Sequence, residues 1–211
     1  MSPLVIDVVS DVVCPWCYVG KRRLEAALRA AGEAEVRWRP FQLDPTIPPD
    51  GLDRKTYMRA KFRDDARLAE AHARLKTLGA EVGVAFDFEA IRRSPNTLDA
   101  HRLIRFAAEA GAADAVVERL FADYFERGRD IGDRAVLIEV ARECGLDGET
   151  IAARLASAEG VEDVRAEIES AQRGGVEGVP FFIFASKIAV SGAQSEAVLT
   201  QAIVRARESA A

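Results

Sequence analysis

The N-terminal part of the chain changes abruptly from a strand pattern to a helix pattern. Residues 4–13, LVIDVVSDVV, are rich in valine and isoleucine, which is typical of a buried strand. Residues 14–32, CPWCYVGKRRLEAALRAAG, instead space apolar side chains such as Leu24 and Leu28 at helical intervals, and Gly32 can end a helix. The sequence therefore predicts a strand that turns directly into a helix, with a pair of cysteines at the turn.

A second strand pattern follows, and then strand patterns nearly disappear. Residues 35–43, EVRWRPFQL, alternate apolar and charged side chains and predict a strand that Pro40 interrupts. After a proline-rich loop, the chain from about residue 54 to 156 shows helical stretches separated by glycines, and we expect almost no strand there. The patterns of the last part of the chain predict a helix over residues 161–175 and a closing helix over residues 195–206. Between them they predict two short antiparallel strands, over residues 181–185 and 187–192.

The element order predicts an α/β fold with a helical insertion. Strand, helix and strand come first, the helical block second, and helix, strand, strand and helix last. No internal repeat or low-complexity linker separates these parts. We expect residues 1–50 and 157–211 to form one discontinuous α/β domain, and residues 51–156 to form an inserted helical domain packed on it.

Composition excludes several classes of partner. The 211 residues carry 29 basic and 34 acidic side chains, interspersed along the chain, so no basic stripe predicts nucleic acid or an anionic membrane as a partner. The apolar residues of the N-terminal segment precede its basic run, the reverse of a secretory signal, and no apolar run reaches the ~18 residues of a membrane helix. A cytoplasmic location is the expectation.

The pair Cys14 and Cys17 has three interpretations. A structural zinc site needs four ligands, but the other candidates, Cys144, His72 and His101, are scattered singly over the helical block. A structural pair requires Cys14 to be buried like a core residue, whereas a turn at a helix start is expected to place its thiol on the outer edge. A redox pair is the third interpretation, and it fits a reducing compartment, where cysteine pairs are more often catalytic than structural.

The position of the pair favours redox chemistry. A thiol at a helix N-terminus lies beside unpaired N–H groups and the positive end of the helix dipole, which favour the thiolate of Cys14. Cys17, one turn later, should point inward and have a higher pKa. The two-residue spacing lets Cys17 reach back and resolve a mixed disulfide on Cys14.

Three segments together resemble a known family. DVVCPWCYVGKRRLEAAL, SPNTLDAHRLIRFA and GVEGVPFFIFASKIAVSGAQ are similar to the FrnE-like branch of the DsbA family in the thioredoxin superfamily, and the resemblance covers essentially the whole chain. It implies a thioredoxin-like fold, a central mixed sheet flanked by helices, with a large all-helical insertion. It also implies that Cys14 is the nucleophile, that Cys17 is the resolving cysteine, and that Pro180 is a cis-proline facing them.

The resemblance also implies which residues meet the substrate. Pro15 and Trp16 lie between the cysteines, and the backbone of Val179, before Pro180, would be able to pair with an extended peptide or with glutathione. Asn96 and His101 belong to the SPNTLDAHR segment, which the resemblance places near the catalytic cleft. Of the remaining polar residues near the turn, Asp11 is a candidate cap for the helix that follows.

The function that follows is thiol–disulfide oxidoreductase or disulfide isomerase, acting on a protein or glutathione thiol or disulfide. We expect no metal and no tightly bound cofactor, glutathione as a candidate co-substrate, and a monomer or homodimer. The alternative is a glutathione-dependent isomerase or transferase acting on an aromatic or polyketide-like molecule, because such enzymes share the superfamily. Those relatives typically carry serine where Cys14 stands and lack the second cysteine. A non-catalytic zinc-bound or interaction protein is the third hypothesis.

Overall fold

The main sheet is mixed, as the resemblance to the DsbA family implies. The computed structural model describes residues 3–62 and 64–209, and within these residues the main sheet has the strand order β2-β1-β5-β6. β1 pairs in parallel with β2 and antiparallel with β5, and β5 pairs antiparallel with β6. The strands are β1 (Val5–Ser10), β2 (Glu35–Pro40), β5 (Phe181–Phe184) and β6 (Ile188–Ser191).

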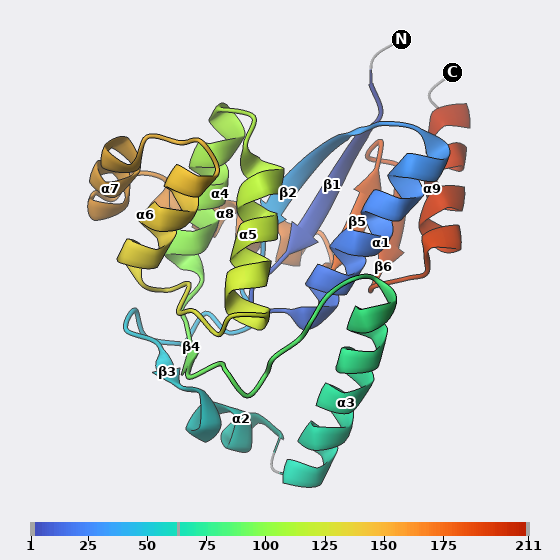
Figure 1. Ribbon diagram of the computed structural model, residues 1–211. Coiled ribbons are helices and arrows are strands. Elements are labelled where there is room, and N and C mark those ends of the chain that lie inside the picture. The colour runs from blue at the N-terminus through green and yellow to red at the C-terminus, as the bar shows by residue number, and fades with distance from the viewer. Residues whose placement is uncertain (1–2, 63, 210–211) are drawn as a thin grey trace.

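Helices cover both faces of this sheet. Figure 1 shows α1 (Pro15–Ala31) and α9 (Glu196–Glu208) side by side on one face, with α8 (Val161–Arg173) behind the sheet. Alternation along β1 explains the layering: Ile6 and Val8 pack with α1 and α9, whereas Val9 belongs to a cluster on the opposite face. Ser195 caps α9, since its hydroxyl accepts a hydrogen bond from the Val198 N–H.

The segment between β2 and α8 is mainly helical. Its helices are α2 (Arg54–Phe62), α3 (Asp65–Glu81), α4 (Leu98–Glu109), α5 (Ala113–Phe125), α6 (Arg134–Glu143) and α7 (Gly148–Ala156). In Figure 1, α2 and α3 lie beyond the end of the sheet where β1 meets α1, and α4 to α7 lie to one side. Within the described residues, the strand structure of this segment is limited to a small ladder of β3 (Leu52–Asp53) and β4 (Arg93–Ser94), which agrees with the expectation of almost no strand; two-residue strands are too short to show alternation in the sequence.

One hydrophobic cluster joins α1 to the helical segment. Tyr18, directly after Cys17, is fully buried, and its ring stacks on Phe121 of α5 with centroids 5.0 Å apart. The Tyr18 hydroxyl donates a hydrogen bond of 2.7 Å to the Glu126 carboxylate. Since the helical segment shares its core with the cysteine-bearing helix, it fixes that helix in place.

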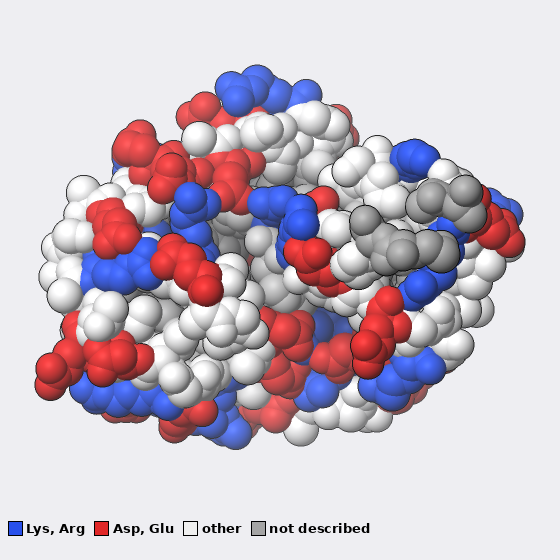
Figure 2. All heavy atoms as spheres, turned by 90° about the horizontal axis from the view of Figure 1, so that it is seen from above, with Lys and Arg blue, Asp and Glu red and all other residues white. Residues whose placement is uncertain are grey.

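Within the described residues, no helix is both long and apolar enough to cross a bilayer. The face seen from above in Figure 2 carries basic and acidic side chains interspersed. This agrees with the even distribution of charge along the sequence.

Candidate active site

The two cysteines lie where β1 gives way to α1. Cys14 is the N-cap of α1, its own N–H donates to the Asp11 carbonyl, and the Cys17 N–H donates to the Cys14 carbonyl at 3.0 Å. Pro15 occupies the first turn, where its missing N–H costs no helical hydrogen bond. Both cysteines are free thiols. The turn therefore holds two thiols at a helix N-terminus, at the place in the chain that the sequence predicts.

Cys14 is more buried than the sequence predicts. Its exposed fraction is 4%, whereas a thiol on the outer edge of the turn was expected. The Cys14 thiol donates to the Val179 carbonyl at 3.6 Å, and residues of α2 and α3 share with it the lining of one cavity. The expectation of an exposed thiol was wrong because these segments, distant in sequence, close over the turn.

Cys17 points into the core, as predicted. Its exposed fraction is 1%, and burial raises the pKa of its thiol well above the ordinary value, with the neighbouring Cys14 acting in the same direction. The Ser10 hydroxyl and the Asp11 backbone N–H act in the opposite direction on the Cys17 pKa. At neutral pH, Cys17 is therefore held as a neutral thiol.

The Val179–Pro180 peptide bond is cis, as the resemblance implied. The Pro180 ring packs against α1 at Gly20, where an added Cβ would lie 2.9 Å from Pro180 Cγ and 3.2 Å from Phe182 Cζ. A glycine at this position permits the close approach of α1 to the segment before β5. Gly20 thus helps to set the position of Val179 relative to Cys14.

A cavity of about 340 Å³ opens beside Cys14. Its walls are mostly apolar and aromatic, a composition typical of small-molecule sites. The apolar lining residues include Val13, Trp16, Leu43, Ile47, Met58, Phe62, Leu75, Phe88 and Val179. Cys17 is not among the lining residues, so Cys14 is the thiol of the pair that faces the cavity.

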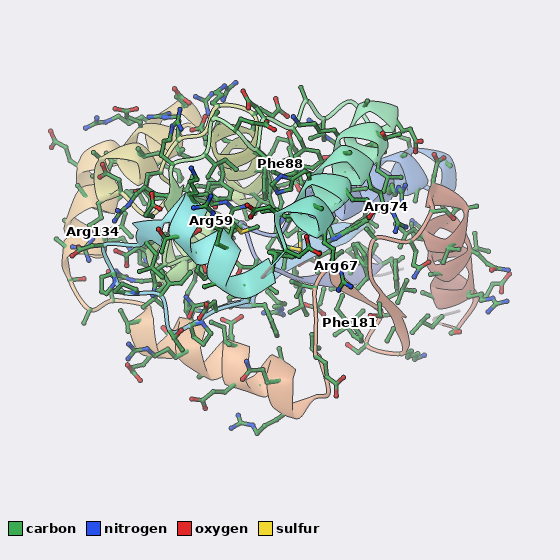
Figure 3. The ribbon with its side chains drawn as sticks, turned by 90° about the horizontal axis from the view of Figure 1, so that it is seen from below. Arg59, Arg67, Arg74, Phe88, Arg134 and Phe181 are labelled. Carbon is green, nitrogen blue, oxygen red and sulfur yellow. The ribbon has the colours of Figure 1, made fainter. Side chains whose placement is uncertain are left out.

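The charged side chains that line this cavity are cations. Arg54 and Lys61 line it, and no aspartate or glutamate does so among the described residues. The Arg54 guanidinium lies 3.3 Å from both the Ser94 and Tyr124 hydroxyl oxygens, and within residues 3–62 and 64–209 it has no carboxylate within 4.0 Å. Figure 3 shows further cations, Arg59 on α2 and Arg67 and Arg74 on α3, on the two helices that wall the cavity.

Asn96 and His101 do not line this cavity. Asn96 instead braces a loop, since its amide donates to the Ile47 carbonyl at 2.6 Å and its oxygen accepts from the Leu98 N–H. His101 is buried behind the turn, where its Nε2–H donates to the Phe41 carbonyl at 2.8 Å. The structure brings Pro15, Trp16 and Val179 together with Cys14, and places Asn96 and His101 elsewhere.

Two residues that line the cavity, His72 and Arg54, lie in stretches of sequence without a recognisable motif. His72 of α3 lines the cavity and stacks on Phe88 with ring centroids 4.1 Å apart, and burial lowers the pKa of its imidazole. Arg54 begins α2 and was not singled out. His72 lies in the charge-rich stretch RLAEAHARLK and Arg54 in DRKTYM, and neither stretch gives any local sign that its helix faces the cysteines.

Asp11 does not cap α1, which corrects a second expectation. No side chain caps this helix, and the Asp11 Oδ2 atom instead accepts from the Leu43 N–H at 2.8 Å. Asp11 is 1% exposed, and its Oδ1 atom lies 3.5 Å from His101 Nε2. Cys144, at the end of α6, is half-buried and does not line the cavity, and burial raises the pKa of its thiol.

The arrangement can perform thiol chemistry at Cys14. The described part of the chain contains no group of three or more His, Cys, Asp or Glu side chains placed to hold a metal ion. The site offers one thiol at a helix N-terminus facing a cavity, a second thiol sealed behind it, and cations opposite.

The solved structures that are similar to the chain include the following three. A probable DsbA oxidoreductase from Streptomyces coelicolor is 36% identical, with a TM-score of 0.88, over 97% of this chain and 90% of that chain. A 2-hydroxychromene-2-carboxylate isomerase is 18% identical, with a TM-score of 0.72, over 98% of each chain.

The third is the cytosolic disulfide reductase DsbM from Pseudomonas aeruginosa, solved with GSH. It is 21% identical, with a TM-score of 0.67, over 96% of this chain and 99% of that chain. At such identities, this structure and the isomerase are similar in fold alone. The model of the DSBA-like thioredoxin domain matches residues 5–204. With the mixed sheet and the thiol pair at the first strand–helix turn, this match shows that the chain belongs to the DSBA-like thioredoxin domain family.

Proposed function

We propose that the protein catalyses thiol–disulfide exchange, as an oxidoreductase or disulfide isomerase, with Cys14 as the nucleophile and Cys17 as the resolving cysteine. The observation that carries the proposal is the asymmetry of the pair: Cys14 occupies the N-cap position of α1 and lines the cavity, and Cys17 is buried behind it with a raised pKa. A helix N-terminus favours the thiolate, which is the attacking form.

The exchange proceeds in two balanced steps. The Cys14 thiolate attacks a substrate disulfide RSSR, the substrate S–S bond breaks, and one RS⁻ leaves and takes a proton from solvent. The Cys17 thiol then loses its proton and attacks the Cys14 sulfur of the mixed disulfide. The second RS⁻ leaves, Cys14 and Cys17 are oxidised to a disulfide, and the substrate is reduced to two thiols. The reverse sequence reduces the protein and oxidises a dithiol.

The cavity favours a small substrate that carries carboxylates. Cys14 lies at the wall of a space of about 340 Å³, with Arg54 and Lys61 as its charged lining residues. Because Arg54 has no carboxylate partner among the described residues, its guanidinium is a suitable anchor for a ligand carboxylate. Glutathione fits this description, and the similar DsbM structure was solved with GSH, so glutathione is the proposed co-substrate.

The subtype and location are part of the same proposal. The CPWC turn and the SPNTLDAHR segment support the FrnE-like branch. DsbM, described as cytosolic, supports a cytoplasmic location. Fractionation of the native host would test the location, because a cytoplasmic protein should appear with the cytosolic markers.

Trapping the intermediate tests the proposal. Cys17→Ala should accumulate a mixed disulfide between Cys14 and oxidised glutathione, because the resolving step is lost, and mass spectrometry should detect it. Cys14→Ser should form no adduct at either position and lose exchange activity, and Cys144→Ala should behave as the wild type. Full exchange activity in Cys14→Ser, or an adduct on Cys17 alone, would contradict the assigned roles.

A glutathione-dependent isomerase or transferase is the second candidate function. The apolar and aromatic cavity walls favour it, since they suit an aromatic molecule. This function would need a bound thiol rather than a dithiol. Turnover of an aromatic substrate with glutathione that survives Cys14→Ser and Cys17→Ala would support it over thiol–disulfide exchange.

A further inference from the structure

The cavity beside Cys14 has two helical walls that differ in their chemistry. The arginine and the lysine that line it, Arg54 and Lys61, both belong to α2, and Tyr57 lies between them at helical spacing. The Lys61 ammonium donates to the Tyr57 hydroxyl at 3.3 Å, and the Arg54 guanidinium lies 3.3 Å from the Ser94 hydroxyl oxygen. The side chains of α2 thus give the cavity a cationic, polar side, the α2 wall.

The α3 wall is uncharged, although α3 itself is rich in charged residues. The residues of α3 that line the cavity recur at helical spacing and are Leu68, Ala71, His72 and Leu75. The charged residues Arg67, Glu70 and Arg74 are exposed and do not line it. In Figure 3, Phe88 and Arg74 lie on opposite sides of α3. The amphipathic pattern of α3 therefore directs its apolar stripe to the cavity and its charges to solvent.

His72 and Phe88 extend the α3 wall as an aromatic face. Their rings stack at an interplanar angle of 12°, and both line the cavity. Burial lowers the pKa of the His72 imidazole, and the neighbouring Arg54 acts in the same direction, so His72 is neutral at neutral pH. A flat, uncharged aromatic face is suited to packing against a planar apolar group.

Two large apolar side chains at this cavity remain open to water. Leu43 and Phe62 are 39% and 40% exposed, and both line the cavity. Phe62 ends α2 and α3 begins at Asp65, so Phe62 lies where the two walls meet in sequence. Exposed apolar surface around a cavity is typical of surface that a ligand covers.

We propose that the substrate is a mixed disulfide of glutathione with an aromatic thiol, with the anionic half along the α2 wall and the aromatic half along the α3 wall. The inference rests on the proposed function and names the substrate class of the same site. Oxidised glutathione has two anionic halves, and one of them would place carboxylates against the uncharged wall, which is unfavourable. A cavity of about 340 Å³ is also at the small end of the ~300–1,000 Å³ of ligand sites, which favours a small disulfide over a polypeptide.

The reaction of this substrate balances in two steps. The Cys14 thiolate attacks the glutathione sulfur, the substrate S–S bond breaks, and the aromatic thiolate leaves and takes a proton from solvent. The Cys17 thiol then loses its proton and attacks the Cys14 sulfur, and the glutathione thiolate leaves and is protonated. Cys14 and Cys17 are oxidised to a disulfide, and the substrate is reduced to one glutathione and one aromatic thiol.

Three disulfides that share one glutathione half test the division of the cavity. They are oxidised glutathione and the mixed disulfides of glutathione with 2-hydroxyethanethiol and with phenylmethanethiol. Each is mixed with the reduced protein below saturation and quenched with acid, and mass spectrometry gives the second-order rate constant of forming the Cys14–Cys17 disulfide. Each constant is divided by the constant for dithiothreitol with the same disulfide, which corrects for intrinsic reactivity.

The corrected constant should be about 10- to 100-fold higher for the phenylmethanethiol disulfide than for oxidised glutathione, the effect of burying one apolar side chain. The hydroxyethyl disulfide should lie between them. Leu68→Lys places a cation on the α3 wall, so it should slow the aromatic disulfide, accelerate oxidised glutathione and lower their ratio by about 10-fold or more. Ala69→Lys adds the same charge at an exposed neighbour that does not line the cavity, and should keep the wild-type ratio.

Equal corrected constants for the three disulfides in the wild type would overturn the division of the cavity alone, and so would a wild-type ratio in folded Leu68→Lys. Absence of the Cys14–Cys17 disulfide with all three substrates would overturn the proposed function and the inference together. The wild-type series needs no variant, so it decides even where circular dichroism shows that Leu68→Lys is unfolded.

Discussion

Cys14 and Cys17 are buried to nearly the same extent but have different surroundings. Both are almost fully buried and belong to one hydrophobic cluster, but Cys14 lines the cavity that Arg54 and Lys61 also line, whereas Cys17 does not line it. The environment of each thiol, and not its exposure, separates the nucleophile from the resolving cysteine in the proposed function.

The raised pKa of Cys17 predicts how stability depends on pH. An unfolded cysteine ionises near pH 8.5, whereas folded Cys17 keeps its proton to higher pH. The folded state therefore binds more protons above pH 8.5. The stabilisation is fully present below about pH 8.5 and is lost as the pH rises from there towards the raised pKa of folded Cys17, by up to about 1.4 kcal/mol per pH unit.

Urea denaturation of the reduced protein between pH 7 and 9.5 measures this slope. The range ends below the ordinary pKa of tyrosine, and a Cys144→Ala background removes the other thiol with a raised pKa. Cys17→Ala in that background should flatten the slope. An unchanged slope would show that Cys17 ionises as it does in the unfolded chain.

Arg54 is expected to select substrates by charge. Arg54→Met should raise the KM for oxidised glutathione by about 10- to 100-fold, because a hydrogen bond to a charged group contributes ~1.5–3 kcal/mol. The KM for uncharged bis(2-hydroxyethyl) disulfide should not change. Arg173→Met, an exposed arginine on α8, is the control and should alter neither value. An equal loss for both substrates would contradict a carboxylate anchor.

At the scale of residues, the sequence predicts the pair of thiols at the strand–helix turn but not the segments that bury Cys14. The spacing of Cys14 and Cys17 and the change from strand to helix pattern predict the pair and its inward second thiol. The burial of Cys14 depends on Val179 and on α2 and α3, whose sequences carry no sign of that contact. The expectation that Asn96 and His101 lie near the cleft came from the resemblance. The sequence gives no sign of the hydrogen bonds that they make instead, to the carbonyls of Ile47 and Phe41.

At the scale of elements, α1 packs closely against the segment before β5 because residue 20 is a glycine. Gly20→Ala would place a Cβ 2.9 Å from Pro180 Cγ, inside van der Waals contact. Overpacking typically costs ~1–3 kcal/mol, and the higher helix propensity of alanine returns up to ~1 kcal/mol. The expected net loss is about 1 kcal/mol in the free energy of unfolding.

Urea denaturation at neutral pH measures the effect of Gly20→Ala. Gly178→Ala is the matched control, because no atom lies within 4 Å of its added Cβ, and it should leave the free energy of unfolding unchanged. A stabilised Gly20→Ala protein would mean that Pro180 moves away without cost. The sequence predicts α1 and β5 themselves, but the contact between them appears only once the sheet brings residues 20 and 180 together.

At the scale of the whole molecule, the helical segment completes the site. The order of strand and helix patterns predicts an α/β fold with a long helical segment between its halves, and the resemblance to the DsbA family implies the mixed sheet. It does not predict which helices meet the dithiol, because α2 and α3 have strongly charged sequences and few buried residues. Their contact with the turn is a property of the assembled chain.

The central claim is that Cys14 and Cys17 form a reversible redox pair. The most direct measurement equilibrates the protein in glutathione buffers of increasing oxidised fraction, traps free thiols with an alkylating reagent and maps the peptides by mass spectrometry. The account predicts that a Cys14–Cys17 disulfide appears in one two-electron transition and disappears when the series is reversed, with Cys144 alkylated throughout. Alkylation of Cys14 and Cys17 in every buffer, with exchange activity intact, would contradict it.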